Sequence, residues 1–78
     1  MIKERFQIVH EEIISTDDDL IQNLTVVAEG KTQKGLLKFA KMKKLDKDKH
    51  FLERCWYEVV QGVPIPESEY INHLNMLI

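Results

Sequence analysis

Three histidines and one cysteine are the side chains of this sequence best suited to bind a metal ion. They are His10, His50, His73 and Cys55. Structural zinc sites usually carry close ligand pairs, such as two cysteines separated by two residues. Here each histidine stands alone on a separate segment, and Cys55 falls on an apolar face beside Trp56. The spacing therefore predicts neither a metal site nor a bound cofactor, and Cys55 is interpreted as a small core residue.

Catalysis by a nucleophile would need a base within hydrogen-bonding reach, and the sequence contains no motif of that kind. Ser15 and Ser68 both lie where helix caps or first helical turns are expected. The glycines, at positions 30, 35 and 62, stand outside any phosphate-binding motif. We therefore predict that the chain is not an enzyme and has no catalytic residues.

The clearest candidate binding residues are lysines. Residues 31–50 carry eight lysines against two aspartates, a balance of +6, whereas residues 1–30 carry seven acids against two bases, a balance of −5. On a helix these lysines would form a stripe that continues past the helix end, and the candidate residues are Lys31, Lys34, Lys38, Lys41 and Lys44. Such a stripe contacts nucleic-acid phosphates, an acidic protein surface or only solvent, and the sequence leaves all three open.

The length of 78 residues predicts one domain, residues 1–78, of modest stability that a second copy would support. The single cysteine excludes an intramolecular disulfide and favours a reducing compartment. The sequence contains neither a signal-peptide core nor an uncharged stretch of about 18 residues, the minimum for a membrane helix. We therefore expect a cytoplasmic protein with no membrane partner.

The spacing of apolar residues predicts an all-α fold, a small bundle of four or five short helices. The first helix is expected over residues 2–14, where apolar residues recur at steps of four, three and four: Ile2, Phe6, Val9 and Ile13. A strand is disfavoured in this segment because apolar and polar residues do not alternate. Ser15 or Thr16 is expected to cap a second helix that ends at Gly30.

Three more helices are expected in the second half of the chain. Thr32 is expected to cap a helix that reaches Met42, and residues 46–61 give the most regular amphipathic pattern. Gly62 is expected to stop that helix, and a closing helix follows from Pro66 to the end. The predicted core contains Trp56 at its centre, with the other apolar residues of these faces around it, among them Phe6 and Phe51.

Residues 62–77 resemble the end of the Cro/C1-type helix-turn-helix family, in which a glycine leads to a proline and a last apolar helix. Thr32-Gln33 is similar to the start of that family's second helix, which would imply DNA binding. The separation of Thr32 from Gly62 is longer than the family's spacing, and residues 46–61 contain no turn. The chain is therefore not assigned to this family.

By elimination, the sequence predicts a small non-enzymatic regulatory or adaptor protein that acts by protein–protein interaction. Its expected partner is another protein or a second copy of the chain, and short lysine- and glutamate-rich chains of this kind are frequent in bacteria and phages. The alternative is a nucleic-acid-binding protein that uses the basic segment from Lys31 to Lys49.

Overall fold

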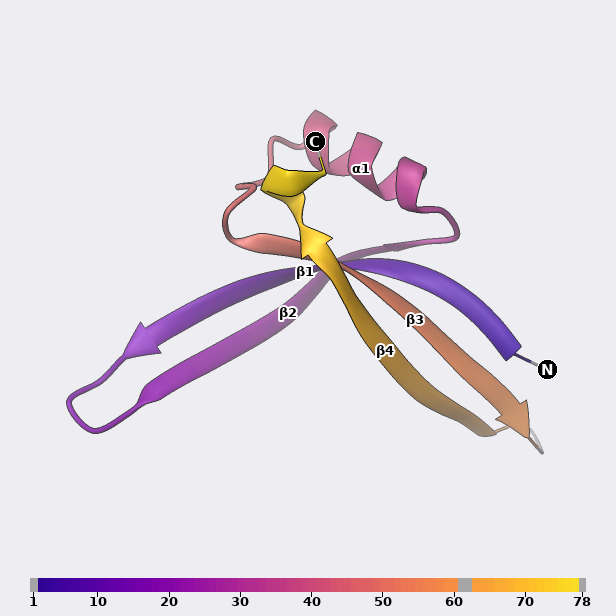
Figure 1. Cartoon of the computed structure of the whole chain (residues 1–78), viewed down its shortest axis with the longest axis horizontal. Coiled ribbons are helices and arrows are strands. Elements are labelled where there is room, and N and C mark those ends of the chain that lie inside the picture. The colour runs from indigo at the N-terminus through magenta and orange to yellow at the C-terminus, as the bar shows by residue number, and fades with distance from the viewer. Residues whose placement is uncertain (1, 61–62, 78) are drawn as a thin grey trace.

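The computed structural model describes the backbone of residues 2–60 and 63–77, and the side chains of residues 3–56 and 67–77. It is a four-stranded antiparallel sheet with one short helix, so the predicted all-α bundle is wrong. The strands lie in the order β2-β1-β3-β4 (Figure 1) and are β1 (Ile2–Ser15), β2 (Leu20–Gly30), β3 (His50–Val60) and β4 (Val63–His73). The helix α1 (Gln33–Met42) joins β2 to β3, and a short 3-10 helix, η1 (Leu74–Met76), follows β4.

The segment predicted as the first helix is the long strand β1, and its environment explains why no alternation is visible. The middle of β1 lies between β2 and β3 and is covered on both faces, since consecutive residues Ile8 and Val9 are only 0% and 3% exposed. A strand covered on both faces is apolar without alternation. The lack of apolar–polar alternation, which argued against a strand in the sequence, is therefore the pattern of a central strand that is covered on both faces.

The segment predicted as the second helix is β2, which forms a hairpin with β1. The side-chain oxygen of Thr16 does accept a hydrogen bond from the backbone N–H of Asp19, at 3.0 Å, as a helix cap would. The Thr16 N–H then donates to the Asp19 carbonyl at 2.8 Å, which closes a tight turn between the strands. The same side-chain chemistry serves hairpin turns and helix caps, so this signal cannot separate the two.

The helix predicted from Thr32 to Met42 is confirmed as α1. Thr32 caps it, since its side-chain oxygen accepts a hydrogen bond from the Gly35 N–H at 3.2 Å. At the end of β2, Gly30 lies under α1, where an added Cβ would come within 3.2 Å of the Leu36 side chain. The absence of a side chain at Gly30 thus favours close approach of strand and helix, and its predicted role as a helix stop is wrong.

The fourth and fifth predicted helices are the strands β3 and β4, so the resemblance of the tail to a helix-turn-helix protein does not extend to its structure. Asp46 and Asp48 shape the loop before β3, because the Asp48 N–H donates to the Asp46 carboxylate at 2.9 Å. His50 also contacts this loop, with its ring Nδ1 2.7 Å from the Asp46 carbonyl oxygen. The predicted helix stop at Gly62 lies outside the described residues.

The core lies between the centre of the sheet and the layer formed by α1 and η1. Its buried members come from four elements and are Ile8, Leu36, Ala40, Leu52 and Leu74. Phe6, predicted for the core, packs against this cluster. On the other face of the sheet Phe51 is buried, with the ring of Tyr70 5.4 Å away. The sheet centre is therefore the stable part of the molecule.

Away from this centre the sheet divides into two diverging parts (Figure 1). Residues 2–5 of β1 pair only with β3, whereas residues 11–15 pair only with β2. The backbone extends over 46 × 34 × 17 Å, which is long and flat for a chain of this length. Within residues 2–60 and 63–77, no helix is long and apolar enough to span a lipid bilayer.

Candidate functional site

The part of the β1–β2 hairpin beyond the sheet centre, residues 11–27, is here called the arm. It projects from the body of the molecule as two paired strands with a four-residue turn at its tip (Figure 1). Seven of the ten large exposed hydrophobic side chains among the described residues belong to it: Ile13, Ile14, Leu20, Ile21, Leu24, Val26 and Val27. Such a concentration of apolar surface on a small protein is typical of an interaction site.

The apolar side chains occupy both faces of the arm. Ile14 pairs with Ile21 across the hairpin, so these two share the face that bears α1 further along the sheet. Leu24 pairs with Glu11 and therefore lies on the opposite face. A two-stranded ribbon with no packed layer is marginally stable in water, so this segment gains stability from any surface that covers it.

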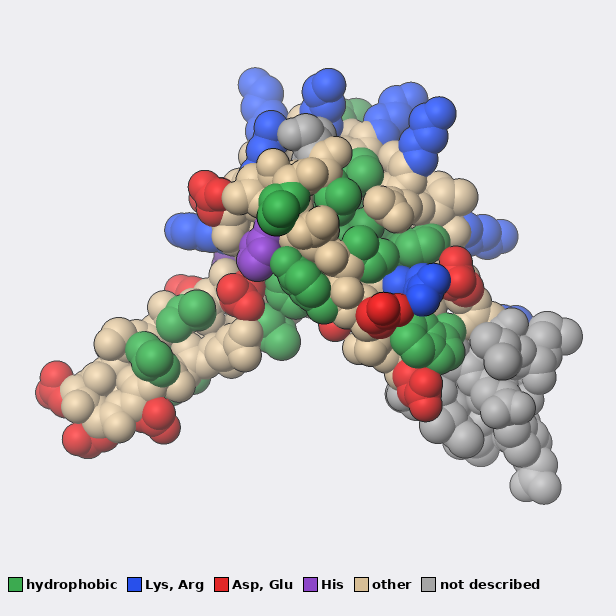
Figure 2. Space-filling model, in the orientation of Figure 1, with side chains coloured by type: hydrophobic (Ala, Val, Ile, Leu, Met, Phe, Trp, Pro, Cys, Tyr) green, Lys and Arg blue, Asp and Glu red, His purple; other side chains and the backbone are tan. Residues whose placement is uncertain are grey.

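The arm is also acidic. Five carboxylates lie in it, three of them consecutive at the tip: Glu11, Glu12, Asp17, Asp18 and Asp19. No lysine or arginine occurs from Phe6 to Gly30. Figure 2 shows acidic side chains around the far end of the arm and most of the basic ones on the α1 side of the molecule, at the top of the view. The arm therefore favours a partner that is apolar and bordered by positive charge.

The two edges of the sheet differ in how they are protected. β4, at one edge, contains Pro64 and Pro66, which lack the backbone N–H needed to pair with a further strand. β2, at the other edge, has no proline, and it has no charged residue from Leu20 to Ala28. Edge strands that resist pairing usually carry prolines or charges. β2 carries neither over nine residues, and its one irregularity is a bulge at Val27, so the segment from Leu20 to Val26 is open to another strand.

The five candidate lysines are all exposed, and the structure gathers them at the α1 end of the molecule (Figure 2). Lys34, Lys38 and Lys41 belong to α1, Lys31 precedes it, and Lys44 follows it in a left-handed conformation with φ 54°. One ion pair is present among the described side chains, between Arg54 and Glu69 at 2.7 Å. The lysines therefore have no described carboxylate in contact.

A hollow of about 450 Å³ lies where the end of β2 meets the start of α1. It is lined on the strand side by Val27 and on the helix side by Lys31, Leu36 and Phe39. It thus combines an apolar floor with a rim that carries both Lys31 and Glu29, directly beside the open edge of the sheet.

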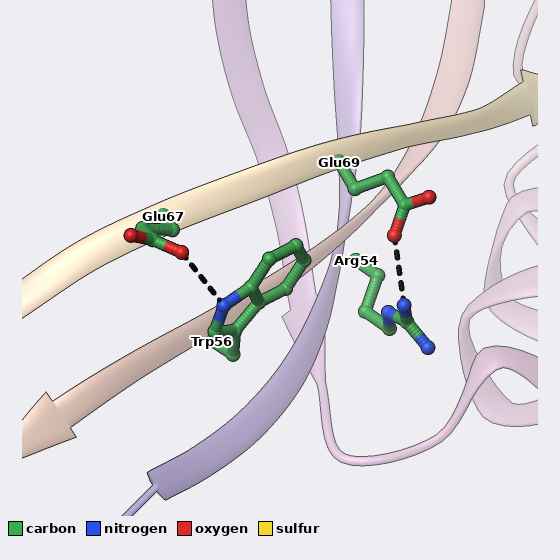
Figure 3. Close-up of polar contacts among 4 residues, drawn as sticks. All are labelled: Arg54, Trp56, Glu67 and Glu69. Atoms are coloured by element: carbon green, nitrogen blue, oxygen red, sulfur yellow. Dashed lines mark hydrogen bonds and ion pairs between the residues drawn. The ribbon is translucent and has the colours of Figure 1, made fainter.

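Trp56 does not lie at the centre of the core, which corrects that prediction. It is partly exposed on β3, where its indole N–H donates to the Glu67 carboxylate at 2.9 Å (Figure 3). The guanidinium carbon of Arg54 lies 5.4 Å from the Trp56 ring centre, so the two make a cation–π contact. In this way the side chain links β3 to β4 rather than filling the core.

Cys55, predicted as a buried residue, is partly exposed and lines a second hollow of about 400 Å³ together with Arg5 and Glu29. Partial burial raises the pKa of the Cys55 thiol, and the carboxylates of Glu53 and Glu29 raise it further. The thiol is therefore a poor nucleophile at neutral pH. The Nε atom of Arg5 is buried without a hydrogen-bond partner.

The histidines lie on three separate strands, but two of them do not stand alone as the sequence suggested. His10 and His50 face each other across β1 and β3 with ring centres 4.9 Å apart. His73 lies apart from them, where its Nδ1 atom is 2.7 Å from the Tyr70 hydroxyl. Among the described residues no group of three or more histidine, cysteine or acidic side chains is arranged to hold a metal ion.

Comparison with known protein families, with curated proteins and with solved structures found no match for this chain.

Sequence reasoning missed the arm, although two signals for it are visible. The apolar pairs Ile13-Ile14 and Leu20-Ile21 flank a short polar segment, which is typical of a hairpin with side chains on both faces. The uncharged run from Leu20 to Ala28, rich in β-branched residues, is typical of a strand. Both signals were outweighed by the helical spacing of the apolar residues.

Proposed function

We propose that this chain is a small non-enzymatic regulatory or adaptor protein that acts by binding another protein through its arm. The observation that carries the proposal is the concentration of exposed apolar side chains on the arm. We place this activity in the cytoplasm, in keeping with the single cysteine.

The chemistry of the arm limits what partner fits. Ile13 is 62% exposed and Leu20 is 68% exposed, so a partner must offer apolar surface to both strands. Burial of that surface would supply most of the binding free energy, at about 25 cal/mol per Å² before the costs of association. Because the tip carries three aspartates, a partner with lysine or arginine at the border of its apolar surface would be selected.

Capture of the partner from an extract of the natural source tests this proposal. Tagged wild-type chain should retain one protein in a fixed ratio, and Ile13→Lys should lose it because a charge would enter the apolar contact. Met76→Lys is the matched control, since Met76 is 71% exposed but lies in η1, away from the arm. Equal capture by the Ile13→Lys and wild-type chains, or no capture by the wild type, would count against a partner on this face.

A second candidate function is nucleic-acid binding by the lysines around α1. The observation that favours it is their exposure on one end of the molecule without contact to a described carboxylate. Phosphate contacts need little more than such a group of positive charges. The glutamine variant of Lys31, Lys34, Lys38 and Lys41 should then lose affinity for DNA or RNA.

The salt dependence of binding separates this candidate from the first. Each lysine that contacts a phosphate contributes about 0.7 to 0.9 to the slope of log affinity against log salt, so the fourfold variant should show a shallower slope. If the wild-type chain fails to shift labelled duplex or single-stranded nucleic acid at low salt, the second candidate is eliminated.

A further inference from the structure

We propose that the arm binds a second copy of this chain. The two β2 strands pair antiparallel about a two-fold axis. This inference rests on the proposed role of the arm in protein binding and names its partner. The product is a continuous eight-stranded sheet in the order β4-β3-β1-β2-β2-β1-β3-β4.

The edges of the sheet favour this arrangement. The uncharged strand segment from Leu20 to Val26, before the bulge at Val27, offers a regular row of backbone groups to a further strand, and an identical strand is complementary to it by symmetry. After pairing, both outer edges of the larger sheet are β4 strands, which contain Pro64 and Pro66. Pairing along β2 therefore stops at two copies.

The charges favour the same arrangement. In an antiparallel pair centred near Leu24, residue 20 of one copy faces residues 28 to 30 of the other. The tip residues Asp17 and Asp18 then lie beside Lys31 and Lys34 of the second copy. In the same register Asp19 faces Glu29 of the second copy, which is a like-charge pair, so the lysines neutralise the acidic tip only in part. The two-fold axis forms these contacts twice.

The hollow beside β2 provides a place for the tip. It borders the strand at Val27 and is rimmed by Lys31, so it lies where the tip of the paired arm arrives. Ile21, which is 46% exposed and shares the face that bears α1, would be covered there. Pairing at the strand edge leaves both apolar faces of the two arms uncovered. The β1 and β2 segments of the two arms then form four adjacent strands, and a different protein would bind to this surface.

Sedimentation equilibrium over a wide range of protein concentration tests the arrangement. The wild-type chain should be dimeric, and Leu24→Lys should raise the dimer dissociation constant by about tenfold or more, because two lysines would face each other at the axis. Met42→Lys is the control, since Met42 is exposed like Leu24, at 69% against 55%, but lies on α1. Circular dichroism of each variant checks that the fold is retained.

A charge exchange tests the predicted neighbours. Asp18→Lys and Lys34→Glu should each weaken the dimer, whereas the chain with both changes should recover wild-type affinity, because each copy again offers opposite charges. Asp18 is suited to this test because the turn hydrogen bonds are made by Thr16 and Asp19. Failure of the double variant to recover would contradict this placement of the tip.

The outcomes also separate this inference from the proposed function. A chain that is monomeric at every concentration, yet loses its captured protein on Ile13→Lys, would overturn self-pairing and leave the arm as a docking surface. A dimer unaffected by Leu24→Lys would overturn pairing along β2. A monomer whose captured protein is also retained by Ile13→Lys would overturn both.

Discussion

Leu52 and Trp56 lie four residues apart on the same face of β3, yet only Leu52 belongs to the core. Leu52 is fully buried between the sheet and α1. Trp56 is partly exposed, and its indole N–H donates a hydrogen bond to the Glu67 carboxylate. We expect Leu52→Ala to lower the free energy of unfolding by about 2 to 5 kcal/mol, because it leaves a cavity. Trp56→Ala should cost less, since its surface is already partly in water. Urea denaturation of both variants measures the difference, and an equal or larger loss for Trp56→Ala would contradict this placement.

At Cys55 the surroundings determine reactivity. Partial burial, with Glu53 and Glu29 nearby, raises the pKa of the thiol, so a smaller fraction is thiolate at any given pH than in the unfolded chain. Alkylation of the native protein should therefore be slower than that of the denatured protein, and its rate should rise at higher pH. Glu29→Gln should shift the rate profile to lower pH, while Glu12→Gln, on the arm, should leave it unchanged. If the pH dependence of the alkylation rate were the same for the native and the denatured protein, the raised pKa of the Cys55 thiol would be refuted.

At the scale of elements, α1 depends on its N-cap. Thr32 accepts the Gly35 N–H, and its replacement by alanine leaves that donor without a partner in the helix. Thr32→Ala should lower the free energy of unfolding by about 1 kcal/mol, and Thr32→Ser should restore most of the loss because serine is an equally good cap. Chemical denaturation checks both values. If Thr32→Ser were as destabilising as Thr32→Ala, the side-chain hydroxyl would not be the cause.

The helix α1 was predictable because its signals are local. The capping threonine, one buried face and the lysines opposite lie within one segment, and all three agree. The strands were not predictable because their burial depends on neighbours distant in the sequence. Ile8 and Val9 are adjacent and both buried, but Ile8 faces α1 whereas Val9 lies on the opposite face of the sheet. This produces the same apolar spacing as a helix, and the turn chemistry of Thr16 did not separate the two readings.

The candidate site was predictable only in part for the same reason. The lysines of α1 share one exposed face because the helix was correctly placed. The arm required knowledge of the sheet, since residues 11–15 of β1 pair only with β2, and Leu24, opposite Glu11 in this two-stranded part, is 55% exposed. A residue pattern shows which side chains are apolar, but the pairing of strands decides which of them remain uncovered.

At the scale of the molecule, charge separation should make self-pairing dependent on salt. The arm and the α1 end carry opposite charges on exposed residues, and exposed charges are screened over about 10 Å at 0.1 M salt. The dimer dissociation constant should therefore rise between low and moderate salt, while the apolar contacts keep some affinity. Sedimentation equilibrium at several salt concentrations measures this change. A dissociation constant that falls as salt is added would mean that like charges meet in the dimer.

Hydrogen–deuterium exchange at low and high protein concentration tests the central claim most directly, that the arm is where this chain meets another protein. The account predicts that backbone amides of β2 from Leu20 to Val26 exchange more slowly at high concentration, because outward N–H groups gain partners in the second copy. Amides of α1 should exchange at the same rate at both concentrations. Exchange in the arm that is independent of concentration and of any captured partner, or slowing confined to α1, would contradict the account.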